Sequence, residues 1–258
     1  MNTKRKKTGR KLLGFMLTLA LVLGLMPGLS LTAYATQNKV NYLEGSWDQE
    51  KGECAFTENS TDSYTVVDAN STVWGAGTYV VNSEVTISGR ITVNGTANLI
   101  LCDGAKLTAS SGITVEGTNA LNIYPGSTAE SIEGTGQLIA SNANGWYAVI
   151  GGTPQKTGGT VTIYGGKVTA TSGGDAAGIG GGAEGAGGAV TVYGGEVTAT
   201  SRSNGAGIGG GEEGAGGTVT VYGGEVTATS ESWGAGIGGG WCKSGGTVSI
   251  YGGTVTAS

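Results

Sequence analysis

The sequence predicts an all-β chain that folds as a right-handed parallel β-helix of about six coils, with 29-residue repeats in its C-terminal half. In that half, tyrosines followed by two glycines and isoleucines within A-x-I-G-G segments both recur at this spacing. Two columns with one period indicate a repeat array, which buries a continuous core only by stacking, and crossovers between parallel strands are right-handed. The columns are Tyr164, Tyr193, Tyr222 and Tyr251, and Ile150, Ile179, Ile208 and Ile237.

Glycine supplies 53 of the 258 residues, a fraction that is typical of disorder where it lacks a period. Here the glycines separate short runs in which Val, Ile and Thr alternate, and this pattern favours strands joined by tight turns. Helical periodicity occurs only at the extreme N-terminus, so the mature chain is predicted to contain strands and turns alone.

Residues 1–35 are predicted to be a signal peptide. Six basic residues lie between positions 4 and 11, Leu12–Leu25 is strongly apolar, and Ala33–Ala35 matches a small-x-small cleavage site. The alternative is an uncleaved anchor, but Pro27 interrupts the apolar run before it reaches the about 20 residues that a spanning helix needs. We expect a secreted, extracellular protein, associated with the cell wall, that is not inserted in a membrane after cleavage.

Cleavage leaves an acidic chain. It removes six of the 14 Lys and Arg residues and none of the 19 Asp and Glu residues, so eight basic residues remain and the formal charge is −11. Nucleic acid and anionic lipid are bound through basic patches, so neither is an expected partner. The charge is compatible with neutral sugars, cations or basic partners.

Residues 36–75 are predicted to form a small N-terminal cap, and residues 76–258 the β-helix. The first region contains less glycine, scattered acidic residues and four large aromatic side chains, Trp47, Phe56, Tyr64 and Trp74. Solenoids require such a segment over the first open layer of the core. At the other end Thr254–Ser258 stops in mid-coil, which indicates either a fragment of a longer protein or a second element over that edge.

Two shorter coils are expected to precede the 29-residue ones. Ala97–Leu101 and Ala120–Tyr124 are similar segments, aligned at a spacing of 23, and the I-T-V segments at 91–93 and 113–115 have a spacing of 22. Gln137–Ser141 takes the place of the later K-V-T-A-T strand, with residues 127–136 as an extra loop.

Each long repeat contains three short strands, which in the third repeat read AGIGG, TVTVY and EVTAT. Successive side chains of a strand point to opposite faces, so one set must fill the core. The inward set of this repeat is predicted to be Ala206, Ile208, Val219, Val221, Val226 and Ala228.

The chain resembles pectin-lyase-like, right-handed parallel β-helix proteins of Gram-positive bacterial surfaces. The resemblance is carried by GGTVTVYGGEVTAT and GAGIGGG in the repeats, and by VWGAGTYVV, LILCDG and NIYPGS before them, over residues 74–258. It implies the β-helix fold and a carbohydrate-binding role. Polysaccharide-cleaving members of this fold use clustered Asp residues for hydrolysis, or Ca²⁺-binding acids with an Arg base for elimination.

No catalytic residues are expected. The chain has no histidine, which removes the commonest general base and the Ser-His and Cys-His pairs. The long repeats contain one Asp, Asp175, and one Arg, Arg202, two positions out of register. The alternatives are a polysaccharide lyase or glycoside hydrolase whose active site lies in missing coils, and a purely structural spacer.

The acidic residues Glu184, Glu212 and Glu213 are a weak candidate for a Ca²⁺ site. Glu184 and Glu213 occupy the same position in successive repeats and should stack, with Glu212 beside them. Hard cations bind several oxygen ligands. The other interpretation is a solvated loop, and no cofactor is otherwise expected.

The candidate ligand-binding residues are Tyr164, Tyr193, Tyr222, Tyr251, Trp233 and Trp241. The tyrosines share the outward parity of the threonines, so they should form a stacked, exposed ladder. Sugar rings pack on aromatic faces. The other interpretation is that the stacked tyrosines stabilise the solenoid. The tryptophans enter only the fourth repeat, where Trp233 replaces Asp175 and Asn204. A glycan site is predicted near Trp233, Trp241 and the Tyr222/Tyr251 pair, in a non-enzymatic adhesin, stalk or carbohydrate-binding module.

The three cysteines are Cys54, Cys102 and Cys242, an odd number for an exported chain. Their separations fit no zinc-binding pattern. We expect free thiols, and a Cys54–Cys102 disulfide is the alternative.

Overall fold

The computed structural model describes residues 38–126 and 136–258. The predicted signal peptide and nearly all of the predicted extra loop at 127–136 lie outside the described residues. Every regular element in the described part is a strand. None of these residues belongs to a helix that is long and apolar enough to cross a membrane.

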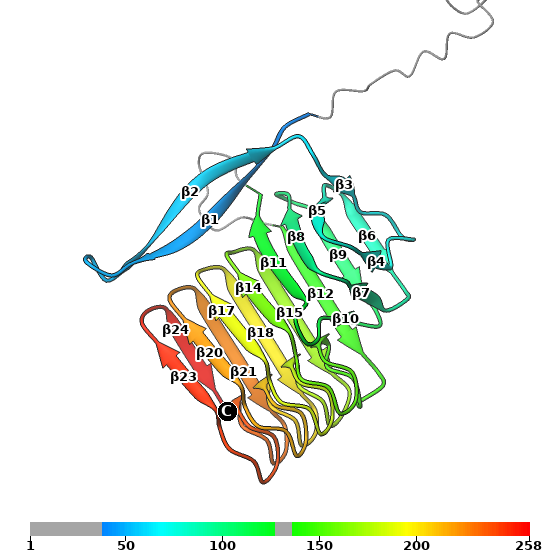
Figure 1. Ribbon diagram of the computed structural model, residues 1–258, viewed down its shortest axis with the longest axis vertical. Helices are drawn as coiled ribbons and strands as arrows, with labels where there is room; N and C mark the ends of the chain where they lie inside the picture. The colour runs from blue at the N-terminus through cyan, green and yellow to red at the C-terminus, as the bar shows by residue number, and fades with distance from the viewer. Residues whose placement is uncertain (1–37, 127–135) are drawn as a thin grey trace, which may run out of the picture. The chain divides into compact units, whose positions relative to one another are not determined.

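Three parallel sheets run along residues 65–257 (Figure 1). The first, named here the short sheet, contains β4 (Val73–Trp74), β7 (Ile91–Val93), β10 (Ile113–Thr114), β13 (Ile150–Gly151), β16 (Ile179–Gly180), β19 (Ile208–Gly209) and β22 (Ile237–Gly238).

The second, the tyrosine sheet, contains β3 (Thr65–Val66), β5 (Gly77–Val81), β8 (Thr96–Leu101), β11 (Ala120–Pro125), β14 (Thr160–Ile163), β17 (Ala189–Val192), β20 (Thr218–Val221) and β23 (Thr247–Ile250). The third, the threonine sheet, contains β6 (Glu84–Ile87), β9 (Lys106–Ala109), β12 (Gln137–Asn142), β15 (Lys167–Ser172), β18 (Glu196–Ser201), β21 (Glu225–Ser230) and β24 (Thr254–Ala257).

One strand from each sheet makes a coil, so the predicted right-handed parallel β-helix is confirmed. The strands of the long repeats pair in parallel at the expected 29-residue offset, as in Ile150 with Ile179 and Val190 with Val219. The described residues form seven three-strand coils rather than about six. The additional coil consists of β4, β5 and β6, which precede the two shorter coils that were predicted.

The predicted inward side chains form the core. All six in the third repeat are at most 1% exposed, and the equivalent residues of the first two repeats are equally buried. In the last coil, Val248 is 42% and Ile250 54% exposed, because no described strand packs on their outer side. Burial of a core layer therefore depends on a coil above and a coil below it.

The alignment of the two shorter coils was wrong by one residue in the tyrosine sheet. Asn98 pairs with Asn122 and Leu99 with Ile123, an offset of 24 rather than 23. A one-residue slip exchanges the two faces of a strand. The observed register directs Leu99 into the core and leaves the asparagines outside, where Asn122 Nδ2 donates to Asn98 Oδ1 at 2.9 Å.

The region predicted to be a cap divides into two parts with different roles. Val67 and Trp74 are buried members of the main core cluster. Residues 40–61 instead form an antiparallel hairpin of β1 (Val40–Asp48) and β2 (Glu53–Thr61). No hairpin residue belongs to the main core cluster, so this part of the prediction is wrong. The hairpin lies beside the tyrosine sheet (Figure 1), and Tyr42 bridges to Gly126 there.

Arg90 joins three successive coils. Its guanidinium donates to Thr114 Oγ1 at 2.6 Å and to the carbonyl oxygens of Ser111 and Ala148 at 2.8 and 2.7 Å, and it lies 5.0 Å from the centroid of the Tyr147 ring. Removal from water lowers the pKa of Arg90 to about 10, so the group remains a cation at neutral pH. These bonds fix the short coils against the first long one.

Candidate functional site

The tyrosines stack, as predicted. Neighbouring ring centroids in the column from Tyr164 to Tyr251 are 5.0–5.2 Å apart, and the planes differ by 7–18°. Tyr124 extends the column by one ring, 4.5 Å from Tyr164. The 29-residue period does not reveal Tyr124, because the extra loop lengthens the step from Tyr124 to Tyr164.

The ladder is not the exposed face that the sequence suggested. Trp47 of the hairpin stacks on Tyr222 at 5.2 Å and lies 5.5 Å from Tyr251, while Tyr42 meets Tyr124 edge-on at 5.0 Å. Tyr124 is only 7% exposed, and Tyr251, at the end of the column, is 56% exposed. The hairpin therefore occupies most of the surface that a sugar ring would need.

Glycine at position 45 permits this close contact. A Cβ atom there would lie 2.8 Å from the Cβ of Tyr193 and 3.1 Å from the ring of Phe56. Leu43 and Gly45 are both buried on the face of the hairpin that meets the ladder. The covered ladder is thus a packing interface between the coils and the hairpin.

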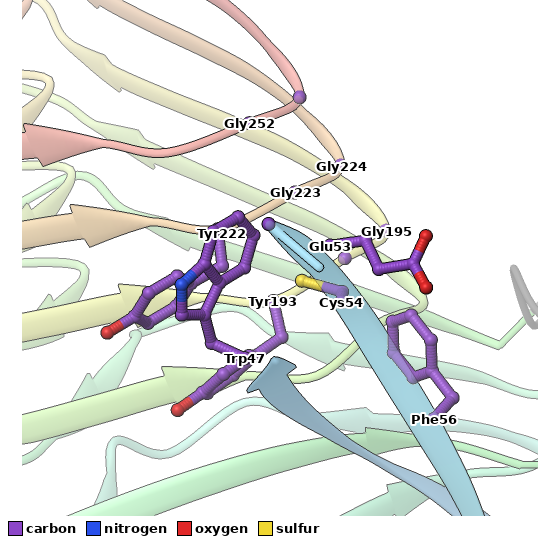
Figure 2. A pocket seen from close by; sticks show the side chains of 13 residues that line it. Trp47, Glu53, Cys54, Phe56, Tyr193, Gly195, Tyr222, Gly223, Gly224 and Gly252 are labelled. Carbon is purple, nitrogen blue, oxygen red and sulfur yellow. The ribbon is translucent and has the colours of Figure 1, made fainter. Parts of the chain in front are cut away.

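A shallow hollow of about 360 Å³ remains between the hairpin and the ladder. Figure 2 shows Trp47, Cys54 and Phe56 facing Tyr193 and Tyr222, with the glycine turns along the rim. The thiol of Cys54 is free, as are those of Cys102 and Cys242, so the alternative disulfide is not formed. Burial raises the pKa of the Cys54 thiol, which keeps it in the unreactive, protonated form.

The environment of the ladder disfavours tyrosinate. Burial is the main cause that raises the pKa of Tyr124, Tyr164 and Tyr193, and the neighbouring phenols and Glu44 add repulsion. Each phenol is therefore held neutral beyond the pH at which an isolated tyrosine ionises.

We expect the folded chain to lose stability as the pH rises above the ordinary tyrosine pKa of 10.0. The unfolded chain releases its phenolic protons there, whereas the folded ladder retains them, so the stabilisation is complete below pH 10.0 and disappears as the folded groups ionise. Ultraviolet absorbance of tyrosinate should show a late-titrating group in the folded chain. Its titration in denaturant is the control, and a single shared transition would contradict the expectation.

Trp233 and Trp241 do lie together, and they are exposed. With Asn204 they line a hollow of about 380 Å³, and their exposed fractions are 76% and 42%. The backbone N–H of Trp241 donates to the Asn204 carbonyl oxygen at 2.9 Å, which brings the two loops together. The Asn204 side chain is fixed as well, since it donates to Glu212 Oε1 at 3.0 Å and accepts from Ser232 Oγ at 3.2 Å.

The tryptophan pair and the tyrosine ladder lie at two different parts of the coil. Trp233 lies between β21 and β22, and Trp241 between β22 and β23, so both flank the short sheet. Tyr222 and Tyr251 follow strands of the tyrosine sheet, and the hollow beside Tyr222 is lined by the hairpin. The predicted site that combined all four residues is therefore wrong, because the tryptophan pair lines a hollow of its own, apart from the tyrosines.

The glutamates do not form the predicted calcium site. Glu184 and Glu213 occupy equivalent left-handed turn positions with φ of 62° and 55°, and Gln155 Nε2 donates to Glu184 Oε2 at 3.1 Å. Glu212 turns instead toward Asn204. The described residues contain no group of three His, Cys, Asp or Glu side chains that could hold a metal ion. These glutamates serve as turn and surface residues.

The sequence interpretation missed one exposed aromatic residue, Trp146, which is 56% exposed. It precedes Asp175 by one repeat period and so occupies the same repeat position as Asp175, Asn204 and Trp233. The backbone confirms the equivalence, because the Ala183 N–H donates to the Trp146 carbonyl oxygen at 2.9 Å, as Trp241 does to Asn204. The 29-residue spacing from Trp146 to Asp175 could have been found from the sequence alone.

The comparisons with known proteins support the repeat architecture. The beta helix repeat family model matches four segments that follow one another at the period of the long repeats, at 161–183, 190–212, 219–241 and 248–258. Together with the parallel sheets, this match supports a β-helix built from sequence repeats. Neither a curated protein nor a solved structure matches the chain significantly.

Proposed function

We propose that this β-helix repeat protein is a secreted, non-enzymatic surface protein that binds neutral polysaccharide through Trp233 and Trp241. The observation that carries the proposal is the hollow in which these two exposed rings flank Asn204. Sugar rings combine apolar C–H faces with hydroxyl groups, so they suit flat aromatic side chains beside fixed hydrogen-bonding groups.

The polar groups around the hollow fit hydroxyl ligands. Asn204 and Glu212 are hydrogen-bonded to one another, which orients an amide and a carboxylate at the edge of the tryptophan pair. Fixed acceptors of this kind bind without a further loss of side-chain freedom. The formal charge of −11 expected for the mature chain favours neutral over anionic glycans.

The proposal of a non-enzymatic role rests on the residues available. The chain has no histidine, and the carboxylates near the tryptophans already have partners: Asp175 accepts from Ser203 Oγ at 2.6 Å and Glu212 from Asn204. We expect these groups to act as hydrogen-bond acceptors for the glycan. The regular, rigid coils would hold the binding surface away from the point of attachment, as in a stalk or adhesin.

The test uses the chain without residues 1–35 and a panel of insoluble and soluble polysaccharides. We expect at least one neutral polysaccharide to deplete the protein from solution, with no release of sugar and little dependence on salt, because stacking is not an ionic interaction. Release of sugar would contradict the non-enzymatic role and would make Asp175 and Glu212 the first residues to substitute. Lack of depletion by every polysaccharide would leave a structural spacer as the function.

A further inference from the structure

We propose that the glycan site extends along the coil edge from Trp233 to Trp146, and that its ligand is a linear oligosaccharide parallel to the axis of the β-helix. The inference rests on the proposed function and adds to it the direction, length and second anchor of the ligand. The first observation is a row of four residues that occupy the same repeat position in successive coils. That row consists of Trp146, Asp175, Asn204 and Trp233.

Backbone hydrogen bonds place a second row beside the first. The N–H groups of Ala183, Glu212 and Trp241 donate to the carbonyl oxygens of Trp146, Asp175 and Asn204, at 2.9, 2.7 and 2.9 Å respectively. Each bond joins one coil to the next, so the two rows run side by side along the edge of the short sheet. The second row consists of Pro154, Ala183, Glu212 and Trp241.

The strip made by these rows has aromatic ends and a polar middle. Trp146 is exposed at one end, and Trp233 and Trp241 at the other. Between them, Asp175 accepts from Ser203 Oγ at 2.6 Å, and Asn204 accepts from Ser232 Oγ at 3.2 Å. In both cases a serine of the next coil orients the polar group, so the middle of the strip presents fixed hydrogen-bonding groups.

The spacing decides the length of the ligand. Trp146 and Trp233 are three coils apart, which is about 14 Å at roughly 4.8 Å per coil. One sugar ring cannot touch both tryptophans, whereas a short linear chain along the coils can stack a ring on each end and direct its hydroxyls to Asp175 and Asn204. A small ligand would occupy only the hollow at Trp233 and Trp241.

The test compares a length series of oligosaccharides from the polysaccharide that depletes the protein, from the disaccharide to the hexasaccharide, by titration calorimetry. We expect affinity to rise with length. Trp146→Ala should leave the disaccharide affinity unchanged and lower the hexasaccharide affinity about tenfold, because only the longer ligand reaches this ring. Trp146→Phe keeps a flat ring and should restore most of the loss. Because Trp146 is exposed, the thermal midpoints of all variants should match that of the wild-type chain.

The outcomes separate the two proposals. If Trp146→Ala binds every length as the wild-type chain does, the extension is wrong while the site at Trp233 and Trp241 stands. An equal loss for the disaccharide and the hexasaccharide would also contradict the extension, since it would place Trp146 in the short-ligand site. If the wild-type chain binds neither the parent polysaccharide nor any fragment, the proposed function fails and the extension fails with it.

Discussion

Replacement of Gly180 by alanine should destabilise the long repeats by at least about 3 kcal/mol, the combined scale of backbone strain and overpacking. Gly180 has a φ of +139°, and an added Cβ would lie 2.0 Å from the carbonyl oxygen of Gly209 in the next coil. That oxygen cannot move aside freely, because it accepts the Gly181 N–H at 2.9 Å. The added methyl group would therefore keep adjacent coils from approaching each other closely at this position.

The measurement is chemical unfolding followed by circular dichroism, with Gly75→Ala as the matched control. A Cβ at Gly75 meets no atom within 4 Å and its backbone needs no left-handed conformation, so this variant should unfold with the wild-type midpoint. Gly180→Ala should unfold at a much lower denaturant concentration or fail to fold. Equal midpoints for the two variants would show that the coils can separate at Gly180 without cost.

The periodic part of the fold could be predicted from the sequence because each coil repeats the same physical problem. Val190, Val219 and Val248 occupy equivalent positions, so a single alternation pattern identifies the inward side chains of every repeat. The exposure of Val248 follows from its place in the last coil rather than from its neighbours in sequence. A repeat pattern thus specifies which way a side chain points, and stacking determines whether it is buried.

The hairpin over the ladder could not be predicted in this way. Trp47 stacks on Tyr222, which lies far along the chain, and residues 40–61 have no repeat that would indicate a partner. The sequence also does not indicate that Gly45 packs against Tyr193, where a Cβ atom would not fit. Parity correctly placed the tyrosines on the outside of the coil, but the outside of a coil is not always exposed to solvent.

The candidate site, too, could be predicted only in part. The sequence correctly marked Trp233 and Trp241 as departures from the repeat, and the structure joins them in one hollow. It placed Tyr222 with them, although the tyrosine lies under Trp47 at a different part of the coil. Comparison of one repeat position across all four coils, including the first, would have found Trp146.

The second large effect concerns binding. The double substitution Trp233→Ala and Trp241→Ala should lower the affinity for the bound polysaccharide about 30-fold, which corresponds to the roughly 2 kcal/mol typical of a tryptophan at the centre of an interface. Both rings line the same hollow, so their individual effects should not add independently. Their side chains are exposed, and the variant should therefore keep the wild-type unfolding midpoint.

Tyr251→Ala is the matched control, because Tyr251 is 56% exposed but belongs to the ladder rather than to the tryptophan hollow. The decisive measurement is the equilibrium affinity of the wild-type chain, the double tryptophan variant and Tyr251→Ala for the same polysaccharide. If the exposed tryptophans are the binding surface, only the double variant should lose affinity for the polysaccharide. Equal affinities of the wild-type chain and the double variant, or a loss in Tyr251→Ala of the same size, would contradict that account.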